Sequence, residues 1–365
     1  MTAAGLPLVR ATGTPFEVGY AHGVARADVL RAFIDDDLCR INRLAAEPVS
    51  AESLRPVLDE YAAAIAAATP ALSEEIDGLA RGAGISRELA VLLQVRREII
   101  GYQRVPARGD CTTYASLSAG PGGGPVLAQT VDLNGNLDDQ IAVLDVCISG
   151  PVPKSAARRA LVLSFGGLLG YLGVNSDGLA IGLNLVLGGQ WRPGLPPYLA
   201  IRHLLDNAGS VAEALAILPG LPLASSRSLT LCDSGRVASV EILGAQTRLV
   251  DNALRAQASH TNHFLHPDFT SLDALNVFAR NSSVLRLKSC ESGLAGLGSG
   301  PAGASVEEHF ALLAQPPICV ADTGDIRRER TVAAVVLLPD RGELHIRPGD
   351  PSRAGTQTFR LDSAA

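Results

Sequence analysis

The chain has 365 residues, of which 47% are hydrophobic and 19% charged, and its formal net charge is −6. This composition provides enough apolar material for one large domain or two ordinary ones. An acidic chain with no long run of Lys or Arg lacks the basic face of a nucleic-acid-binding protein. Residues 1–10 show no secretion signal, and the longest apolar stretch, residues 161–174, is too short to cross a membrane. We therefore expect a cytoplasmic protein with neither a nucleic acid nor a membrane as partner.

The first hundred residues predict helices. Thr14, Pro15 and Glu17 supply a capping hydroxyl, a proline at the first helical position and a carboxylate at the third. The amphipathic helix that they begin is expected to extend to about residue 44. Three further helices are expected over residues 52–68, 70–80 and 86–102.

Short apolar strands are predicted after Asp110. Because most of these runs are continuously apolar, both faces of their sheet should be buried, one by helices and the other by a second sheet. The predicted strands are residues 111–117, 125–132, 141–148, 160–165, 170–175, 179–185, 228–232, 238–243, 247–250, 331–338 and 343–347. The predicted helices in this part are residues 197–207, 211–218, 275–291 and 306–314.

The chain has six cysteines, and none is close enough to another for a C-x-x-C metal or redox pair. Most of them should be small buried hydrophobic residues. Cys111 differs because it begins a predicted strand and is followed by the polar residues Thr112, Thr113 and Tyr114. From these residues alone, an inert buried thiol and a functional one both remain open.

The sequence Gly-Asp-Cys-Thr-Thr-Tyr at 109–114 resembles the processing site of the penicillin acyltransferase family (acyl-coenzyme A:6-aminopenicillanic acid acyltransferase and its relatives). Five other segments resemble motifs of that family and follow its order across almost the whole chain. These segments are residues 13–23, 128–132, 173–179, 261–264, and 331–340 together with 349–351.

This resemblance implies an α+β fold, the four-layer αββα sandwich of N-terminal-nucleophile hydrolases. It also implies that the precursor cleaves itself between Asp110 and Cys111, which frees an α-amine on the nucleophile. An α-amine has a reference pKa of about 7.7–8.0, so it can serve as the base near neutral pH. Fragments 1–110 and 111–365 should stay associated as one structural domain. The expected substrate is a small acyl or amide compound, with an acyl thioester among the candidate donors, and we expect no cofactor or metal.

The resemblance also assigns roles to residues around the nucleophile. Asp132 would orient the new α-amine, and Asn262 would donate to the oxyanion that develops on the substrate carbonyl. Asn175 is a candidate polar contact, although its Asn-Ser-Asp-Gly context is equally typical of a turn. Arg330 is the candidate C-terminal arginine, in preference to Arg328, although a solvated charge cluster is the simpler interpretation. Each of these residues also has an ordinary structural interpretation.

Some features depart from the family or favour other functions. Asp110 stands where the penicillin enzyme has glycine, residues 318–326 match only loosely, and Gln129 replaces an arginine of the related bile-salt hydrolases. Histidines 260, 263 and 266 are three residues apart, but no further zinc ligands are evident, so we do not predict a zinc site. The alternative function is that of an unprocessed, non-catalytic binding or scaffold protein on the same fold.

Overall fold

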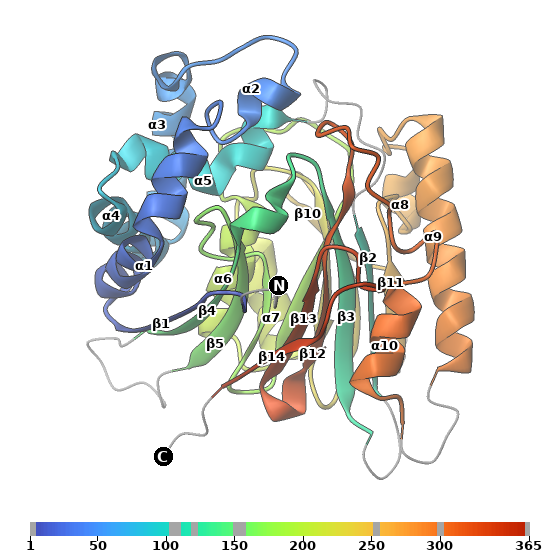
Figure 1. Cartoon of the computed structure of the whole chain (residues 1–365). Coiled ribbons are helices and arrows are strands. Elements are labelled where there is room, and N and C mark those ends of the chain that lie inside the picture. Colours follow the sequence, from blue (N-terminus) through green and yellow to red (C-terminus); the bar gives the residue numbers. More distant parts are fainter. Residues whose placement is uncertain are drawn as a thin grey trace.

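Two β-sheets packed face to face form the centre of the protein in the computed structural model (Figure 1), which describes residues 5–101, 111–117, 123–148, 158–250, 256–297 and 303–361. Strands β2 and β3 of one sheet pack on β7 and β8 of the other. The first sheet has the order β1 (Leu8–Gly13), β4 (Ile141–Ile148), β5 (Arg159–Phe165), β6 (Leu172–Asn175), β7 (Ala180–Leu185), β8 (Arg227–Cys232), β9 (Val237–Leu243) and β10 (Gln246–Leu249). The second has the order β11 (Gln257–His260), β2 (Cys111–Leu117), β3 (Pro125–Leu133), β12 (Arg330–Leu338), β13 (Glu343–Pro348) and β14 (Gln357–Arg360).

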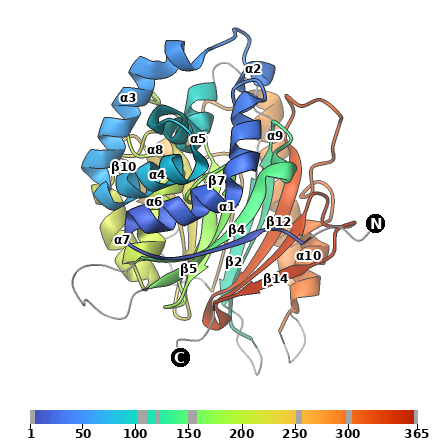
Figure 2. The ribbon, with the colours of Figure 1, turned by 60° about the vertical axis from the view of Figure 1, so that its left-hand side comes forward.

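Helices cover the outer face of each sheet (Figures 1 and 2). The layer on the eight-stranded sheet contains α1 (Pro15–Asp35), α3 (Ala51–Ala68), α4 (Pro70–Ala83), α5 (Arg87–Ile100), α6 (Pro197–Asn207) and α7 (Val211–Ile217). The layer on the six-stranded sheet contains α9 (Val277–Gly296) and α10 (Val306–Leu313). The short helices are α2 (Ile41–Leu44) and α8 (Pro267–Thr270), and the 3₁₀ turns are η1 (Leu137–Gln140), η2 (Leu218–Gly220) and η3 (Pro339–Arg341). The predicted α+β class with four αββα layers is therefore confirmed.

The first strand, β1, was not predicted from the sequence. Only Val9 and Ala11 are buried among its six residues, so it carries too little apolar character to be distinguished from a loop. It pairs in parallel with β4 over its whole length and forms one edge of the eight-stranded sheet. Strands β11 and β14, which also were not predicted, are short and partly exposed strands at the two edges of the other sheet.

The first helix ends at Asp35, about nine residues before its predicted end. The next turn contains Asp37, Leu38, Cys39 and Arg40, all with φ between 50° and 61°, a left-handed conformation that costs about 1–2 kcal/mol per non-glycine residue. Side chains hold this turn in place. Arg40 donates to the Gly135 carbonyl (3.0 Å) and pairs with Asp36 (2.8 Å), while Nε of Arg96 donates to the Cys39 carbonyl (2.6 Å).

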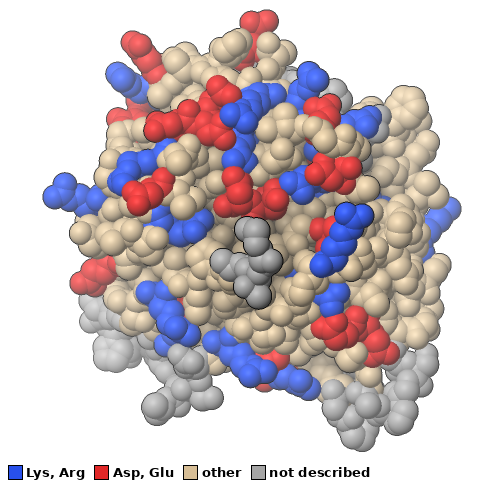
Figure 3. Space-filling model, viewed as in Figure 1, with Lys and Arg blue, Asp and Glu red and all other residues tan. Residues whose placement is uncertain are grey.

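The surface shows mixed charge on the face in Figure 3, where Lys and Arg side chains alternate with Asp and Glu. Within the described part of the chain, no helix is long and apolar enough to span a bilayer.

Candidate active site

Cys111 is the first residue of β2 and lies at one end of the sheet interface. Only 2% of its surface is exposed, and its strand partner on β3 is Val131. Its Sγ lies 3.9 Å from the Tyr171 hydroxyl, which comes from the loop before β6. Asp110, the other side of the predicted cleavage point, lies outside the described residues.

Side chains from three separate elements hold the backbone of Cys111. Its N–H donates to Oδ1 of Asn262 (3.2 Å). Its carbonyl accepts from Nδ2 of Asn184 on β7 (3.0 Å) and from Nη1 of Arg286 on α9 (2.7 Å). The backbone on both sides of the thiol is therefore fixed, as a pre-organised nucleophile requires.

Arg286 is central to this cluster and was not predicted from the sequence. Its side chain is fully buried, and it donates to Thr112 Oγ1 (3.1 Å) and Asn262 Oδ1 (2.6 Å) as well as to Cys111. One guanidinium thus joins helix α9 to the start of β2 and to the 261–264 segment. The sequence did carry an indication, because Arg286 stands among Ser283, Leu287 and Cys290 on the buried side of α9, where an arginine is rare.

Asn262 lies beside Cys111 as predicted, but its contacts add a role. The guanidinium of Arg286 can only donate, so the atom that faces it must be the carboxamide oxygen. The Nδ2 group donates to the Leu185 carbonyl (2.9 Å), and the backbone N–H donates to Ser283 Oγ (2.8 Å). The oxygen therefore faces the nitrogen of Cys111, which is the nitrogen that chain cleavage would convert to the α-amine. The role of Asn262 as an oxyanion donor stays a prediction.

Asp132 is also close to Cys111 along the sheet, since it follows Val131, the strand partner of Cys111. It is fully buried and accepts hydrogen bonds from Thr331 Oγ1 (2.6 Å) and Thr130 Oγ1 (3.3 Å). Thr130 in turn accepts from the Thr112 N–H (3.1 Å). The carboxylate is thus connected to the residue after Cys111 through one hydroxyl. Its contact with a free α-amine stays a prediction.

The structure does not bring Asn175 into this cluster. Its amide group donates to the carbonyls of Leu205 (2.9 Å) and Ala208 (2.7 Å), and its Oδ1 accepts from the backbone N–H groups of Asp177 (3.2 Å) and Leu179 (3.0 Å). All four hydrogen-bonding positions of the side chain therefore serve backbone groups of the hairpin and of the end of α6.

Arg330 likewise has its contacts elsewhere. Its Nε donates to Asn136 Oδ1 (3.2 Å) and lies 3.6 Å from the Asp322 carboxylate, while its Nη2 pairs with Asp138. The sequence analysis proposed Arg330 as the arginine at the site. The arginine that contacts Cys111 is instead Arg286 on α9, which donates to the Cys111 carbonyl.

Gln129 connects the two sheets below Cys111. Its side chain exchanges two hydrogen bonds with the backbone of Leu183 on β7 (2.9 and 3.0 Å). A Cβ at Gly182 would stand 2.7 Å from the Gln129 carboxamide oxygen, so only glycine fits there. These two hydrogen bonds to the backbone of the other sheet give the buried amide a structural task.

The five other cysteines are poor candidates for the nucleophile. Burial raises the pKa of the Cys39 and Cys290 thiols to about 12, and it also raises the pKa of Cys147, Cys232 and Cys319. A thiol with a raised pKa supplies little thiolate near neutral pH.

The three histidines at positions 260, 263 and 266 make separate contacts. His260 pairs with the buried Glu241 (2.8 Å), whereas His263 contacts Ser283 Oγ (2.8 Å). Nδ1 of His266 accepts from the Asp268 N–H at the start of α8 (3.2 Å). Among the described residues, no group of three or more His, Cys, Asp or Glu side chains is arranged to hold a metal ion.

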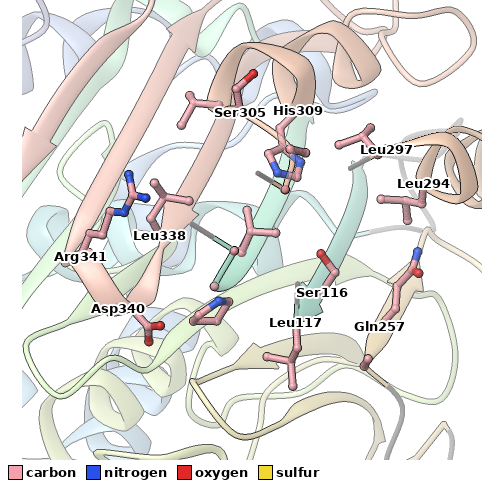
Figure 4. Close-up of a pocket in the computed structure, with 18 residues that line it drawn as sticks. Ser116, Leu117, Gln257, Leu294, Leu297, Ser305, His309, Leu338, Asp340 and Arg341 are labelled. Atoms are coloured by element: carbon pink, nitrogen blue, oxygen red, sulfur yellow. The ribbon is translucent and has the colours of Figure 1, made fainter. Parts of the chain in front are cut away.

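Two cavities differ in their relation to Cys111. The larger one, of about 630 Å³, is lined by Ser116 and Leu117 at the far end of β2 and by Leu294, His309 and Asp340 (Figure 4). Six residue steps along a strand place it about 20 Å from Cys111. A smaller cavity of about 40 Å³ is lined by Tyr171, whose hydroxyl contacts the thiol, so this one adjoins the cluster.

Together, the fold and the cluster define an α+β sandwich with a cysteine held at the start of an inner strand. The chain belongs to the acyl-coenzyme A:6-aminopenicillanic acid acyl-transferase family, whose sequence model matches residues 119–352. The family resemblance inferred from the motifs is therefore confirmed. Cys111 itself lies just before the matched range.

Individual relatives are similar to this chain over most of its length. The acyl-coenzyme A:6-aminopenicillanic-acid-acyltransferase 40 kDa form of Emericella nidulans is 28% identical over 272 residues, which cover 73% of this chain and 72% of that protein. Penicillin V acylase from Agrobacterium tumefaciens is similar in structure, with 15% identity and a TM-score of 0.46 over 69% of this chain and 86% of that one. A variant of conjugated bile acid hydrolase from Clostridium perfringens has 12% identity and a TM-score of 0.47 over 68% and 97% of the two chains.

Proposed function

We propose that this protein is a self-processing cysteine enzyme that cleaves or forms amide bonds, with Cys111 as its nucleophile. The observation that supports this most strongly is the fixed backbone of Cys111, whose N–H and carbonyl are both held by buried side chains from other elements. An inert core cysteine needs no such set of polar contacts, because its environment is usually apolar. Family membership supports the same class of chemistry.

The first step of the proposal is chain cleavage. The Cys111 thiol attacks the carbonyl carbon of residue 110, the peptide nitrogen of Cys111 takes up a proton and leaves, and a thioester forms. Water then hydrolyses the thioester, which returns the thiol and leaves a carboxylate on residue 110. The nitrogen of Cys111 becomes a free α-amine, which Asn262 Oδ1 orients. The hydrogen bond that this oxygen accepts from the Cys111 N–H supports the role.

The second step is turnover. The α-amine accepts the thiol proton as Sγ attacks an acyl carbonyl, and it returns that proton to the leaving group. The resulting acyl-enzyme is resolved by water, which gives hydrolysis, or by an amine, which gives acyl transfer. Arg286 acts here as a positioning residue, because its guanidinium holds the Cys111 carbonyl and Asn262 together.

Gel electrophoresis and mass spectrometry of the purified protein test this proposal. Scaling the 37.9 kDa chain by residue count predicts fragments of about 11 and about 26 kDa, the larger beginning at Cys111. Cys111→Ala should remain a single chain and be inactive on N-acyl compounds. Cys290 is a buried cysteine on α9, so Cys290→Ala is the matched control, and this variant should be cleaved normally. A wild-type chain that stays intact after prolonged incubation would refute self-processing.

A further inference from the structure

A buried histidine and a buried glutamate join the two sheets close to the candidate active site. His260 ends β11 of the six-stranded sheet, where it pairs with Thr113 of β2, and Glu241 lies on β9 of the eight-stranded sheet. Both side chains are fully buried, and Nε2 of His260 lies 2.8 Å from Oε1 of Glu241. Cys111 begins β2, two residues before Thr113. The two side chains therefore belong to the surroundings of the nucleophile.

The hydrogen bonds of His260 determine how many protons its ring carries. Its Nδ1 lies 2.7 Å from the Thr261 carbonyl oxygen, which can only accept a hydrogen bond, so Nδ1 must donate. Its Nε2 faces Glu241, which also accepts from the backbone N–H groups of Leu265 (2.6 Å) and His266 (3.0 Å). Because N–H donors favour the ionised form of a carboxyl group, the proton between the two side chains belongs to Nε2. His260 is therefore an imidazolium that forms a charge pair with the Glu241 carboxylate.

The neighbouring histidine, His263, differs from His260 in its charge. Burial, followed by repulsion from His260 and from Arg280, lowers the pKa of His263 to about 4. Its Nδ1 lies 2.8 Å from the Ser283 hydroxyl, a group that can either donate or accept, so this contact does not require a second ring proton. His263 is therefore neutral near neutral pH, and of these two rings only His260 carries a charge that pairs with Glu241.

Asn262 lies between two sets of contacts that hold its segment. On one side, its backbone N–H donates to Ser283 Oγ (2.8 Å), and Thr261 Oγ1 donates to the Ser283 carbonyl (3.0 Å), so the segment is attached to α9. On the other side, the charge pair binds the Thr261 carbonyl and two later backbone N–H groups, so the segment is attached to β9. Between these attachments, Asn262 Oδ1 lies 3.2 Å from the Cys111 nitrogen.

We propose that the charge pair of His260 and Glu241 positions Asn262 for the reaction at Cys111. Hydrogen bonds between charged groups are shorter and stronger than neutral ones, so the pair holds the segment more firmly than two uncharged side chains would. Such firmness matters because a shift of about 1 Å in a catalytic group can cost about a hundredfold in rate. His260 and Glu241 are positioning residues, since they act through Asn262. Their effect on turnover rests on the proposed function of Cys111, whereas the charge of His260 and its hold on Asn262 do not.

NMR spectroscopy of protein labelled with nitrogen-15 in its histidines tests the charge of His260. A neutral imidazole carries one ring N–H, whereas an imidazolium carries two. The wild type at neutral pH should show one buried histidine with two ring N–H protons that exchange slowly with water, and both signals should be missing in His260→Gln. Glutamine keeps a donor towards Glu241 but has no charge. Loss of a single ring proton in that variant, or of none, would refute the charge pair.

The side-chain amide of Asn262 reports its own position without any turnover. In protein labelled at asparagine, its signal is the one that Asn262→Ala removes, and it should shift or broaden in His260→Gln. His345→Gln is the matched control, because His345 also pairs with a glutamate, Glu343 (2.9 Å), but on β13, and this variant should leave the Asn262 signal unchanged. An unchanged Asn262 signal in a folded His260→Gln protein would overturn the positioning role.

Melting temperatures show whether each variant folds. Removal of one partner leaves the other charge buried and unpaired, which is more costly than removal of both. If His260→Gln does not fold, the double variant His260→Gln/Glu241→Gln therefore takes its place in the same measurements. It keeps two amides that can hydrogen-bond to each other but removes both charges, and it should displace the Asn262 signal in the same way.

A double-mutant cycle extends the test to the reaction. With pentanoyl p-nitroanilide as the probe, His260→Gln should lower kcat by about tenfold or more and change KM little, since the pair does not touch the substrate. In the Asn262→Ala background the same substitution should have no further effect, because no side chain is left to position. Equal losses in both backgrounds would overturn the positioning role. A wild type that turns over no amide would count against the proposed function, and the two NMR measurements would still decide the present inference.

Discussion

Substitution of Arg286 tests how much of the catalytic geometry depends on one buried guanidinium. Arg286 reaches the Cys111 carbonyl and Thr112 Oγ1 through Nη1 and reaches Asn262 Oδ1 through Nη2. Lysine keeps the charge but has a single nitrogen, so it cannot bind acceptors on both sides of the fork. Arg286→Lys therefore loses at least one charge-assisted hydrogen bond, worth about 1.5–3 kcal/mol, and chain cleavage should slow by about 10- to 100-fold. Arg286→Met, which also loses the charge, should be slower still.

The assay is the rate at which the full-length chain disappears on a denaturing gel after synthesis. Arg280→Lys is the matched control, because Arg280 is on the same helix but is partly exposed and pairs with the buried Asp273 carboxylate (3.6 Å). Melting temperatures of all variants show whether the fold is retained. If Arg286→Met folds and is cleaved at the wild-type rate, Arg286 does not position the nucleophile.

Three further substitutions have expected outcomes. Asn262→Ala should lower turnover about a hundredfold if its amide serves the oxyanion or the α-amine, and an unchanged kcat would remove it from the site. Asn175→Ala should instead destabilise the fold by about 3 kcal/mol, since four hydrogen bonds to backbone groups are lost, with kcat per folded molecule preserved. A low kcat with normal stability would assign Asn175 to catalysis. Burial lowers the pKa of His309 from 6.5 to about 4. The unfolded chain therefore binds a proton first as the pH falls from 6.5 towards 4, and up to about 3 kcal/mol of stability is lost in that window. Urea unfolding of His309→Gln should show a weaker loss over this range, and an identical pH dependence would contradict the assignment.

The layers of the fold were predictable because burial of the strands and helices determines where apolar residues stand in the sequence. Apolar runs indicated inner strands, such as residues 141–148 and 179–185, which the structure gives as Ile141–Ile148 and Ala180–Leu185. The edge strand β1 was not predictable, because an edge strand is stabilised mainly by backbone hydrogen bonds that any residue can make. The left-handed turn at residues 37–40 was also missed, since the contacts that hold it come from Arg40 and from the distant Arg96.

Some residues of the candidate site could likewise be predicted from the sequence, and others could not. Cys111, Asp132 and Asn262 follow from local motifs, and the structure places all three at the start of β2 or directly beside it. Arg286 could not be assigned from a motif, because its role depends on how α9 packs against the sheet. Asn175 was assigned to the site from its motif, but the same motif is typical of a hairpin turn. The structure shows Asn175 in the turn, where its Oδ1 accepts from backbone N–H groups.

Strand β1 has a consequence for the fate of the two fragments. It belongs to the segment before Cys111, yet it covers the free side of β4, which belongs to the segment after it. If the chain is cleaved between residues 110 and 111, β1 of the shorter fragment continues to cover the edge of the eight-stranded sheet. Fragment 111–365 expressed alone would present an unpaired row of backbone N–H and C=O groups, a template for joining other chains edge to edge. The leading segment would then be needed to keep the mature protein from self-association, long after its part in chain cleavage is over.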